Sequence, residues 1–231
     1  MQTRYAALAR LAPRTDHSNR GDATRQKLID AALRIFGDYG FDGASTRMLA
    51  DAAGANLAAI PYYFGGKEGL YRAAAQFVVE TSSKELAPTI EKIDGALVQR
   101  GISRKLACEL LHELLDRFSA LVIGSRAADT WASFVMREQL HPGAAFEILY
   151  EGMMRPITSA ATKLVATIQK RAPDDPQAII ATQTILGQIL IFRVGRTAAL
   201  RTLGWKTFSP DHLRLIRSVV GENVDRIMGQ P

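Results

Sequence analysis

The fold of this chain is decided by residues 46–71, which read TRMLADAAGANLAAIPYYFGGKEGLY. Ser45 and Thr46 offer an N-cap, which we place at Thr46, for a short helix expected over 47–53. Gly54 ends this helix because glycine readily adopts the left-handed conformation. A third short helix is expected over 57–64. Two short helices separated by a tight turn that contains glycine are typical of a helix-turn-helix.

Longer helices flank this stretch on both sides. Apolar residues between 28 and 36 fall largely at spacings of three and four, which predicts an amphipathic helix over about 23–39. A fourth helix is expected to begin at Lys67 and to run toward Leu86, with Pro88 near its end. This helix is long enough to connect two domains.

The rest of the chain also predicts helices, because no stretch shows sustained strand alternation. Pro156 is expected to kink the helix predicted over 142–171. The expected fold class is therefore all-α, with a three-helix helix-turn-helix domain over 21–66 and a larger helical domain over 67–231. The expected later helices span 103–123, 129–139, 142–171, 176–203 and 210–228.

Composition indicates a soluble globular protein of the cytoplasm. The 231 residues are 47% hydrophobic and 23% charged, which is ample material for a core. Cys108 is the single cysteine, so an intramolecular disulfide and a zinc site of paired cysteines are both excluded. Arg10 interrupts the N-terminal apolar stretch before it reaches signal-peptide length. The uncharged run 176–192 contains several polar residues and is expected to be a buried helix, not a membrane span.

The charge balance favours a polyanionic partner. The chain carries 29 Lys and Arg against 23 Asp and Glu, a net charge of +6. The excess per residue is about twice as dense in 1–75 as in the remainder. Residues 1–20 are expected to form a flexible basic arm that could enter a DNA minor groove. The alternatives for this segment are a disordered tail and a wrongly assigned start codon.

The candidate DNA contacts lie at helix ends, where free N–H groups and side chains can grip phosphates. Thr46 and Arg47 stand at the start of the second helix, and Lys67 starts the fourth. The N-terminal residues of the third helix are mostly apolar, so base readout would rest on Asn56, on thymine methyl groups and on DNA shape. Pro61 is unfavourable inside that helix. The candidate DNA-binding residues are Thr46, Arg47, Asn56, Leu57, Ala58, Tyr62, Tyr63 and Lys67.

Residues 46–71, together with the segment AALRIFGDYGF at 31–41, resemble the DNA-binding motif of TetR-family transcriptional regulators. The resemblance implies an all-helical homodimer with an N-terminal DNA-binding domain and a larger domain for ligand binding and dimerisation. It also implies phosphate contacts by Thr46 and Lys67. Pro61 departs from the pattern, because many members have a DNA-contacting tyrosine there, and Tyr63 stands where many have histidine.

The segments 136–147, 150–156 and 191–205 are similar to the C-terminal domain of the CecR-type subgroup. That subgroup includes regulators of drug-efflux genes. The resemblance therefore implies a ligand-responsive regulator, expected to be a repressor that binds a pseudo-palindromic operator.

An effector cavity is expected among the middle helices, where aromatic and thioether side chains are frequent. Arginines within mostly apolar helices are further candidates, because a buried charge needs a partner. An ordinary core is the alternative for each apolar residue. The candidate ligand-binding residues are Trp131, Phe134, Arg137, Phe146, Tyr150, Met153, Phe192, Arg193 and Arg196.

The last two helices present apolar residues that could form a four-helix bundle between two subunits. The expected partners are thus double-stranded DNA, a small-molecule effector and a second copy of the chain, with no membrane, metal or cofactor. No motif typical of catalysis is present, so we expect no enzyme. One alternative is a small-molecule-binding helical protein or degenerate enzyme whose helix-turn-helix does not bind DNA. Another is a redox or metal sensor built on Cys108 and His112.

Overall fold

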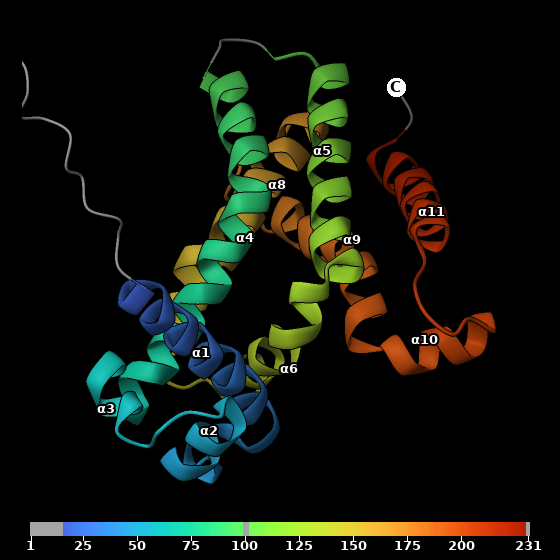
Figure 1. The fold of residues 1–231 in the computed structure, drawn as a ribbon. Helices are drawn as coiled ribbons and strands as arrows, with labels where there is room; N and C mark the ends of the chain where they lie inside the picture. Colours follow the sequence, from blue (N-terminus) through green and yellow to red (C-terminus); the bar gives the residue numbers. More distant parts are fainter. Residues whose placement is uncertain (1–15, 99–101, 230–231) are drawn as a thin grey trace, which may run out of the picture.

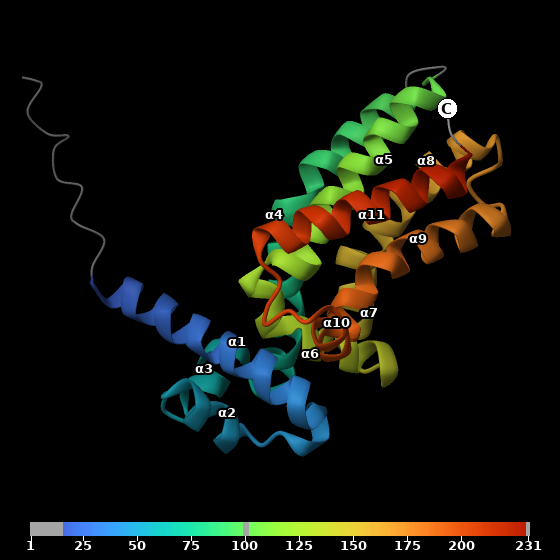
Figure 2. The ribbon, with the colours of Figure 1, turned by 90° about the vertical axis from the view of Figure 1, so that its right-hand side faces the viewer.

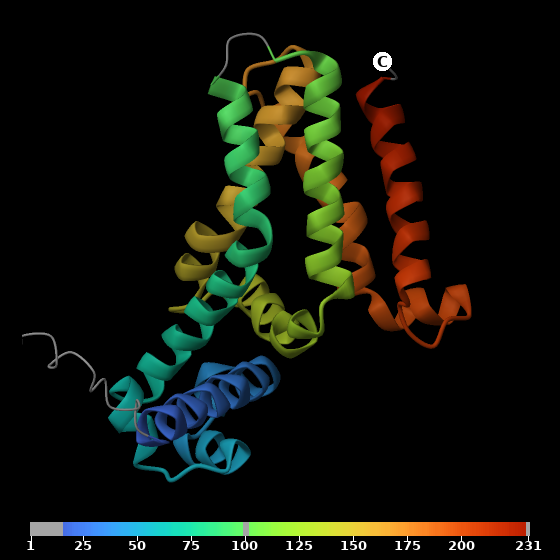
Figure 3. The same ribbon diagram turned by 45° about the horizontal axis from the view of Figure 1, so that its top comes forward.

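The computed structural model describes residues 16–98 and 102–229, and every regular element in these ranges is helical (Figure 1), which confirms the all-α class. Helices α1, α2 and α3 form an N-terminal unit, and α4 rises from it to the C-terminal helices (Figure 3). The elements, in which η1 and η2 are π-helical turns, are α1 (Asp16–Gly43), α2 (Thr46–Ala53), α3 (Ala59–Phe64), α4 (Lys67–Val98), α5 (Arg104–Ser119), η1 (Ala120–Gly124), α6 (Arg126–Leu140), α7 (Phe146–Leu149), η2 (Tyr150–Met154), α8 (Arg155–Gln169), α9 (Pro176–Val194), α10 (Arg196–Leu203) and α11 (Pro210–Met228).

The N-terminal unit is closed by the apolar face of α1. Leu33 and Phe36 are fully buried, and Leu49 from α2 and Ile60 from α3 complete the same core. Helix α1 begins at Asp16, earlier than predicted, so the last five residues of the predicted arm are helical. The first fifteen residues of that arm lie outside the described residues.

The two short helices differ in detail from their prediction. Ser45 is the N-cap of α2, since its hydroxyl accepts from the Met48 N–H at 3.1 Å, and Thr46 is the first helical residue. Of the two residues that offered an N-cap, Ser45 is therefore the cap, and its placement at Thr46 was wrong by one position. Helix α3 begins at Ala59 because Asn56 Oδ1 accepts from the Ala58 N–H at 2.9 Å and holds a turn there.

Pro61 fits α3 because it is the third residue of the helix. The first N–H groups of any helix lack an intrahelical carbonyl acceptor, so a proline at this position removes no helical hydrogen bond. The expected conflict at Pro61 is thereby resolved.

Helix α4 does not end near Pro88, as the sequence predicted, but continues ten residues further to Val98. The proline ring is exposed, so losing one hydrogen bond leaves no unpaired group in the core. Leu86 and Ile93, about two turns apart, are buried on the inner face and hold the helix against its neighbours.

The two longest predicted C-terminal helices are interrupted. The single helix predicted over 142–171 is replaced by α7, η2 and α8, and the irregular turn η2 falls directly before Pro156. Proline lacks the N–H that would continue the α-helical ladder, which accounts for the wider π-helical turn. The helix predicted over 176–203 is broken at Gly195 into α9 and α10.

Helices α9 and α11 lie side by side on one face of the C-terminal unit (Figure 2). Helix α9 was expected to be buried, but only one of its faces is: Ile185 and Ile189 are covered, whereas Ile180 and Ile191 are more than half exposed. In the described part of the chain, Pro176–Val194 is long and apolar enough to cross a membrane by length and composition alone. Its buried face packs against α8 and α11.

Candidate DNA interface and effector cavity

The predicted DNA contacts lie on α2, the following turn, α3 and the first residue of α4, and several of them are strongly exposed. The Arg47 side chain is 86% exposed, and Tyr62 is 80% exposed. Leu57 is an apolar residue in the turn, yet half of its surface faces solvent. Side chains that pack in a core are not exposed to this extent, so these three side chains are available to a partner.

Lys67 and Tyr63 are fixed by aromatic contacts. Lys67 begins α4, and its Nζ lies 4.4 Å from the centre of the Phe41 ring, a cation–π distance. The Tyr63 ring meets that of Tyr62 edge to face, with 4.8 Å between the ring centres. Tyr63 is half-buried, and its hydroxyl lies close to Gly21 in α1. Tyr62 therefore presents the more accessible of the two hydroxyl groups.

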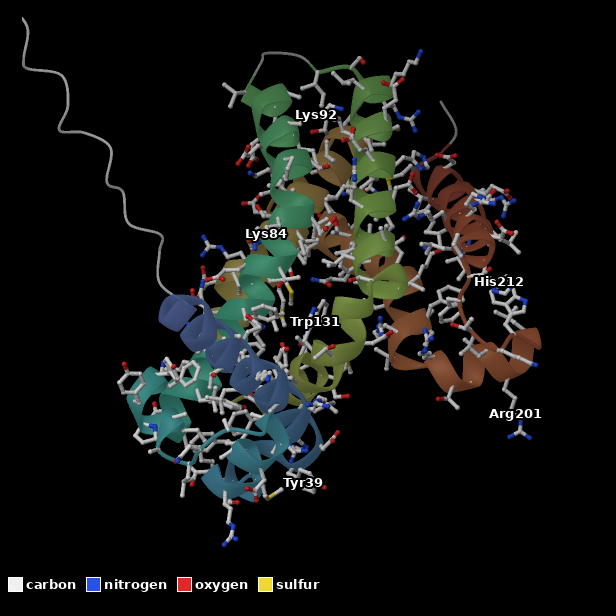
Figure 4. The ribbon with its side chains drawn as sticks, in the orientation of Figure 1. Tyr39, Lys84, Lys92, Trp131, Arg201 and His212 are labelled. Atoms are coloured by element: carbon white, nitrogen blue, oxygen red, sulfur yellow. The ribbon has the colours of Figure 1, made fainter. Side chains whose placement is uncertain are left out.

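A cavity of about 300 Å³ lies within the C-terminal unit, at the small end of the range for ligand pockets. It is bounded by α5, η1, α6, α8 and α9, together with the segment from α7 to η2. Five of the nine predicted ligand-binding residues line it: Trp131 (labelled in Figure 4), Phe146, Tyr150, Met153 and Arg193. Its other lining residues are Phe118, Leu121, Val122, Ala132, Val135, Met136, Gln139, Met154, Ile157, Thr158, Gln183, Leu186 and Leu190.

The other four predicted residues do not line this cavity, as far as the described residues show. Phe134 points to the opposite side of α6, where its ring meets that of Tyr71 at 5.2 Å. Phe192 packs edge to face on Phe208, and the Arg196 guanidinium lies 4.9 Å from the same Phe208 ring. Because neighbouring positions of a helix face different directions, a run rich in aromatic residues does not tell which of them share a cavity.

Arg137, the fourth, lies where α1 crosses α6. Gly40 has φ +74°, and a Cβ added there would lie 2.6 Å from Nε of Arg137. A Cβ at Gly37 would lie 2.9 Å from that of Ser133. The two glycines thus allow α1 and α6 to approach closely, so that Arg137 covers the end of α1 instead of entering the cavity.

Several of the missed cavity residues carry no distinguishing signal in the sequence. Leu121 and Val122 come from η1, and their apolar side chains are like those of any core helix. Thr158 and Gln183 add neutral polar groups from α8 and α9. Only the folded arrangement shows that these segments meet around one space.

Arg193 is the charged residue of the cavity lining, and its side chain is only 10% exposed. Its Nε donates to the carbonyl of Val122 at 2.6 Å, and its Nη1 donates to Asp129 Oδ1 at 2.6 Å. The arginine therefore links α9 to η1 and α6 beside the cavity.

A buried hydrogen-bond network joins α6 to α4. Glu138 is 1% exposed, and its carboxylate accepts from the hydroxyl of Tyr71 and, at 3.2 Å, from the N–H of Gly143. Burial, followed by the hydrogen bond to Glu138, raises the pKa of Tyr71 above its ordinary range, so the hydroxyl stays protonated and donates. We call Tyr71, Glu138, Phe134 and Arg137 the joint, because they connect the cavity helix α6 to the N-terminal unit and α4.

Comparison with known proteins decides what kind of molecule carries these two regions. Residues 28–74 match the model of bacterial regulatory proteins of the tetR family. Residues 107–230 match the C-terminal domain of the HTH-type transcriptional dual regulator CecR. The chain belongs to the TetR family. The match over 28–74 covers α2 and α3, and the match over 107–230 covers all residues that line the cavity.

Individual relatives support this TetR-family membership. The chain is 34% identical over 209 residues to the dual regulator CecR of Shigella flexneri, covering 90% of this chain and 93% of CecR. It is 33% identical over 79 residues to the repressor AcnR of Corynebacterium efficiens, covering 34% of this chain and 40% of AcnR. In fold it resembles AmtR of Mycobacterium smegmatis, with a TM-score of 0.60, 20% identity and coverage of 95% and 91%. CecR and AcnR are transcriptional regulators, so the chain is a regulator and not an enzyme.

Cys108 of this TetR-family chain has no metal-binding neighbourhood in the described residues, which contain no group of three or more side chains suited to a metal. Burial raises the pKa of its thiol, which disfavours the reactive thiolate. His112, one turn along α5, has its Nε2 2.7 Å from Oδ1 of Asp225 in α11. The geometry thus relates His112 to the docking of α11.

Proposed function

We propose that this chain is a ligand-responsive repressor that binds a pseudo-palindromic operator as a dimer, with its DNA-binding domain over 21–66. The observation that carries the proposal is the position of α6. One side of α6 lines the cavity through Trp131 and Val135, and the other contacts the N-terminal unit and α4 through Phe134 and Glu138. A change in the shape of the cavity would therefore reach the N-terminal unit, which would bind DNA, through the single helix α6.

DNA contacts would fall into two kinds. Thr46 lies in the first turn of α2 and Lys67 in that of α4, where N–H groups and a hydroxyl or ammonium can hold phosphates. Arg47 and Tyr62 extend the same contact. Asn56, Leu57 and Ala58 would face the bases. Because Asn56 Oδ1 is engaged with Ala58, its amide nitrogen is the group left for a base acceptor.

A second copy of the chain would cover the exposed apolar faces of α9 and α11. Such faces on two neighbouring helices are what a four-helix bundle between subunits requires. The dimer would place two copies of α3 in successive major grooves, about 34–36 Å apart. The exposed residues are Ile179, Ile180, Leu190, Ile191 and Val194 of α9 and Leu215, Val219 and Ile227 of α11.

A ligand in the cavity would act by favouring one position of α6. Since Glu138 and Arg137 connect α6 to α4 and α1, this position would set the orientation of the N-terminal unit. The ligand weakens DNA binding only to the extent that it binds the competing conformation more tightly.

We propose that the protein acts in the cytoplasm and that it represses drug-efflux genes. AcnR is named a repressor, which supports repression, and CecR is named a dual regulator, which leaves activation at other sites as an outcome of experiment. The efflux targets are what the resemblance to the CecR-type subgroup implies.

Selection of bound sequences from a random double-stranded DNA library, repeated at two salt concentrations, tests the proposal. We expect a symmetric site whose recovery weakens as salt rises, since phosphate contacts release counterions. Recovery that is blind to both sequence and salt would overturn the DNA-binding role. It would instead favour a small-molecule-binding helical protein whose helix-turn-helix serves packing.

A further inference from the structure

We infer that the effector is an amphiphilic organic anion, an apolar body of modest size that carries one carboxylate, sulfonate or comparable acidic group beside Arg193. The inference rests on the proposed function, because it assigns a chemical class to the ligand of the same cavity.

Two buried hydrogen-bond donors at the cavity have no acceptor among the described residues. Nη2 of Arg193 is one, although the other nitrogens of that guanidinium donate to Val122 and Asp129. The indole Nε1 of Trp131 is the second, and this side chain is 5% exposed. Leaving a buried donor unpaired is unfavourable, so a ligand that supplies an acceptor makes a hydrogen bond that the protein alone lacks.

The charge of the lining has one sign. Arg193 is its charged member, and no Asp or Glu is among the lining residues of the described chain. Asp129 balances Arg193 from outside the lining, but its side chain is 56% exposed, so solvent screens much of its charge. An anion entering the cavity would therefore meet an incompletely neutralised guanidinium, whereas a cation would lose its hydration beside a like charge.

The remaining surface selects the body of the ligand. Phe118, Trp131 and Phe146 supply aromatic rings, and Met153 and Met154 supply adaptable thioethers. Polar groups such as those of Thr158 and Gln183 are neutral. The volume of about 300 Å³ suits two or three fused or linked rings, or a short acyl chain, better than a large polar molecule.

Two fluorescent probes with the same body test the inference. 8-Anilinonaphthalene-1-sulfonate and N-phenyl-1-naphthylamine share the anilinonaphthalene skeleton, and only the first carries an anionic group. Their dissociation constants are measured by fluorescence titration with the full-length protein. Ala132→Phe, which places a ring in the cavity, serves as the control for binding elsewhere on the surface. We expect this variant to lose both probes.

Arg193→Met keeps an unbranched apolar stem and removes the guanidinium with its donors and charge. We expect the affinity of the sulfonate probe to fall about tenfold while that of the neutral probe stays within about twofold. Asp129→Asn tests the charge of Arg193 in the opposite direction, because it removes the carboxylate that partly neutralises the guanidinium. We expect it to strengthen binding of the sulfonate probe. Trp131→Phe should weaken the sulfonate probe by a smaller factor.

The outcomes separate the inference from the proposed function. Equal losses for both probes in Arg193→Met would show that the arginine only supports the fold of the cavity, and this would overturn the inference. Unchanged affinity of the sulfonate probe in that variant would overturn it as well. Failure of both probes to bind the wild-type cavity would overturn the inference and the effector role together. None of these results alters the DNA selection, which tests DNA binding by itself.

Discussion

The N-terminal unit and the C-terminal cavity place their functional groups in opposite environments. The unit around α2 and α3 keeps its functional groups outside, with Arg47 and Tyr62 almost fully exposed and held by short local contacts. The cavity hides its functional groups, and its lining is collected from five helices and two π-helical turns. The residues of a DNA-binding surface can thus come from one continuous segment of the sequence, whereas a cavity exists only after distant segments have packed.

Phe134→Ala should produce the largest loss and would break the connection between the two regions. The ring is 1% exposed and meets Tyr71 edge to face, so its removal leaves a void at the joint. We expect the free energy of unfolding to fall by about 3–5 kcal/mol in urea titrations. Leu140→Ala on the same helix is the control, since Leu140 is 69% exposed and should change stability by less than about 0.5 kcal/mol. Similar losses for both variants would contradict a packed joint.

Glu138→Ala should have the next largest effect, because it leaves the buried Tyr71 hydroxyl and the Gly143 N–H without their acceptor. We expect a loss of about 1–3 kcal/mol for the groups left unpaired, again from urea unfolding. Glu138→Gln retains an acceptor oxygen and should lose less. If alanine were tolerated as well as glutamine, the carboxylate would not be holding α6 to α4.

Lys67→Ala tests whether this lysine contributes a phosphate contact beside the exposed N-terminal unit. We expect weaker binding to every DNA sequence and a salt dependence whose logarithmic slope is smaller by about 0.9, the contribution of one phosphate contact. Anisotropy titrations of a labelled duplex at several salt concentrations give the slope. Lys105→Ala, on the exposed side of α5, is the matched control. An unchanged slope in Lys67→Ala would remove this lysine from the interface.

Lys92→Met should have the smallest effect, because the Lys92–Glu113 pair lies on the surface. The hydrogen bond from Lys92 lowers the pKa of Glu113, so the pair stabilises the fold at neutral pH and loses this contribution as the pH falls through that lowered value. We expect less than about 1 kcal/mol of destabilisation at pH 7. The difference from wild type should vanish at a pH where Glu113 is protonated, and persistence there would point to lost packing instead.

The contrast between the regions also explains what could be predicted from sequence. Helices α2, α3 and α11 follow local rules of periodicity and capping, and the structure places their ends within two residues of the predicted bounds. The passage of α4 through Pro88 was not predictable locally, because buried neighbours of the helix outweigh one lost hydrogen bond. Arg193 was a reasonable cavity candidate on charge alone, whereas Arg137 met the same criterion and lies at the joint.

The most direct test of the coupling through α6 is the operator affinity of Ala132→Phe, measured on the selected DNA site. Ala132 lines the cavity, so the added ring mimics an occupied state without requiring an identified ligand. Lys105→Phe adds the same ring to the exposed side of α5 as a control. If α6 couples the cavity to the N-terminal unit, Ala132→Phe weakens DNA binding by at least about fivefold with unchanged helix content, while the control binds as wild type does. Wild-type affinity in a folded Ala132→Phe protein would contradict this coupling.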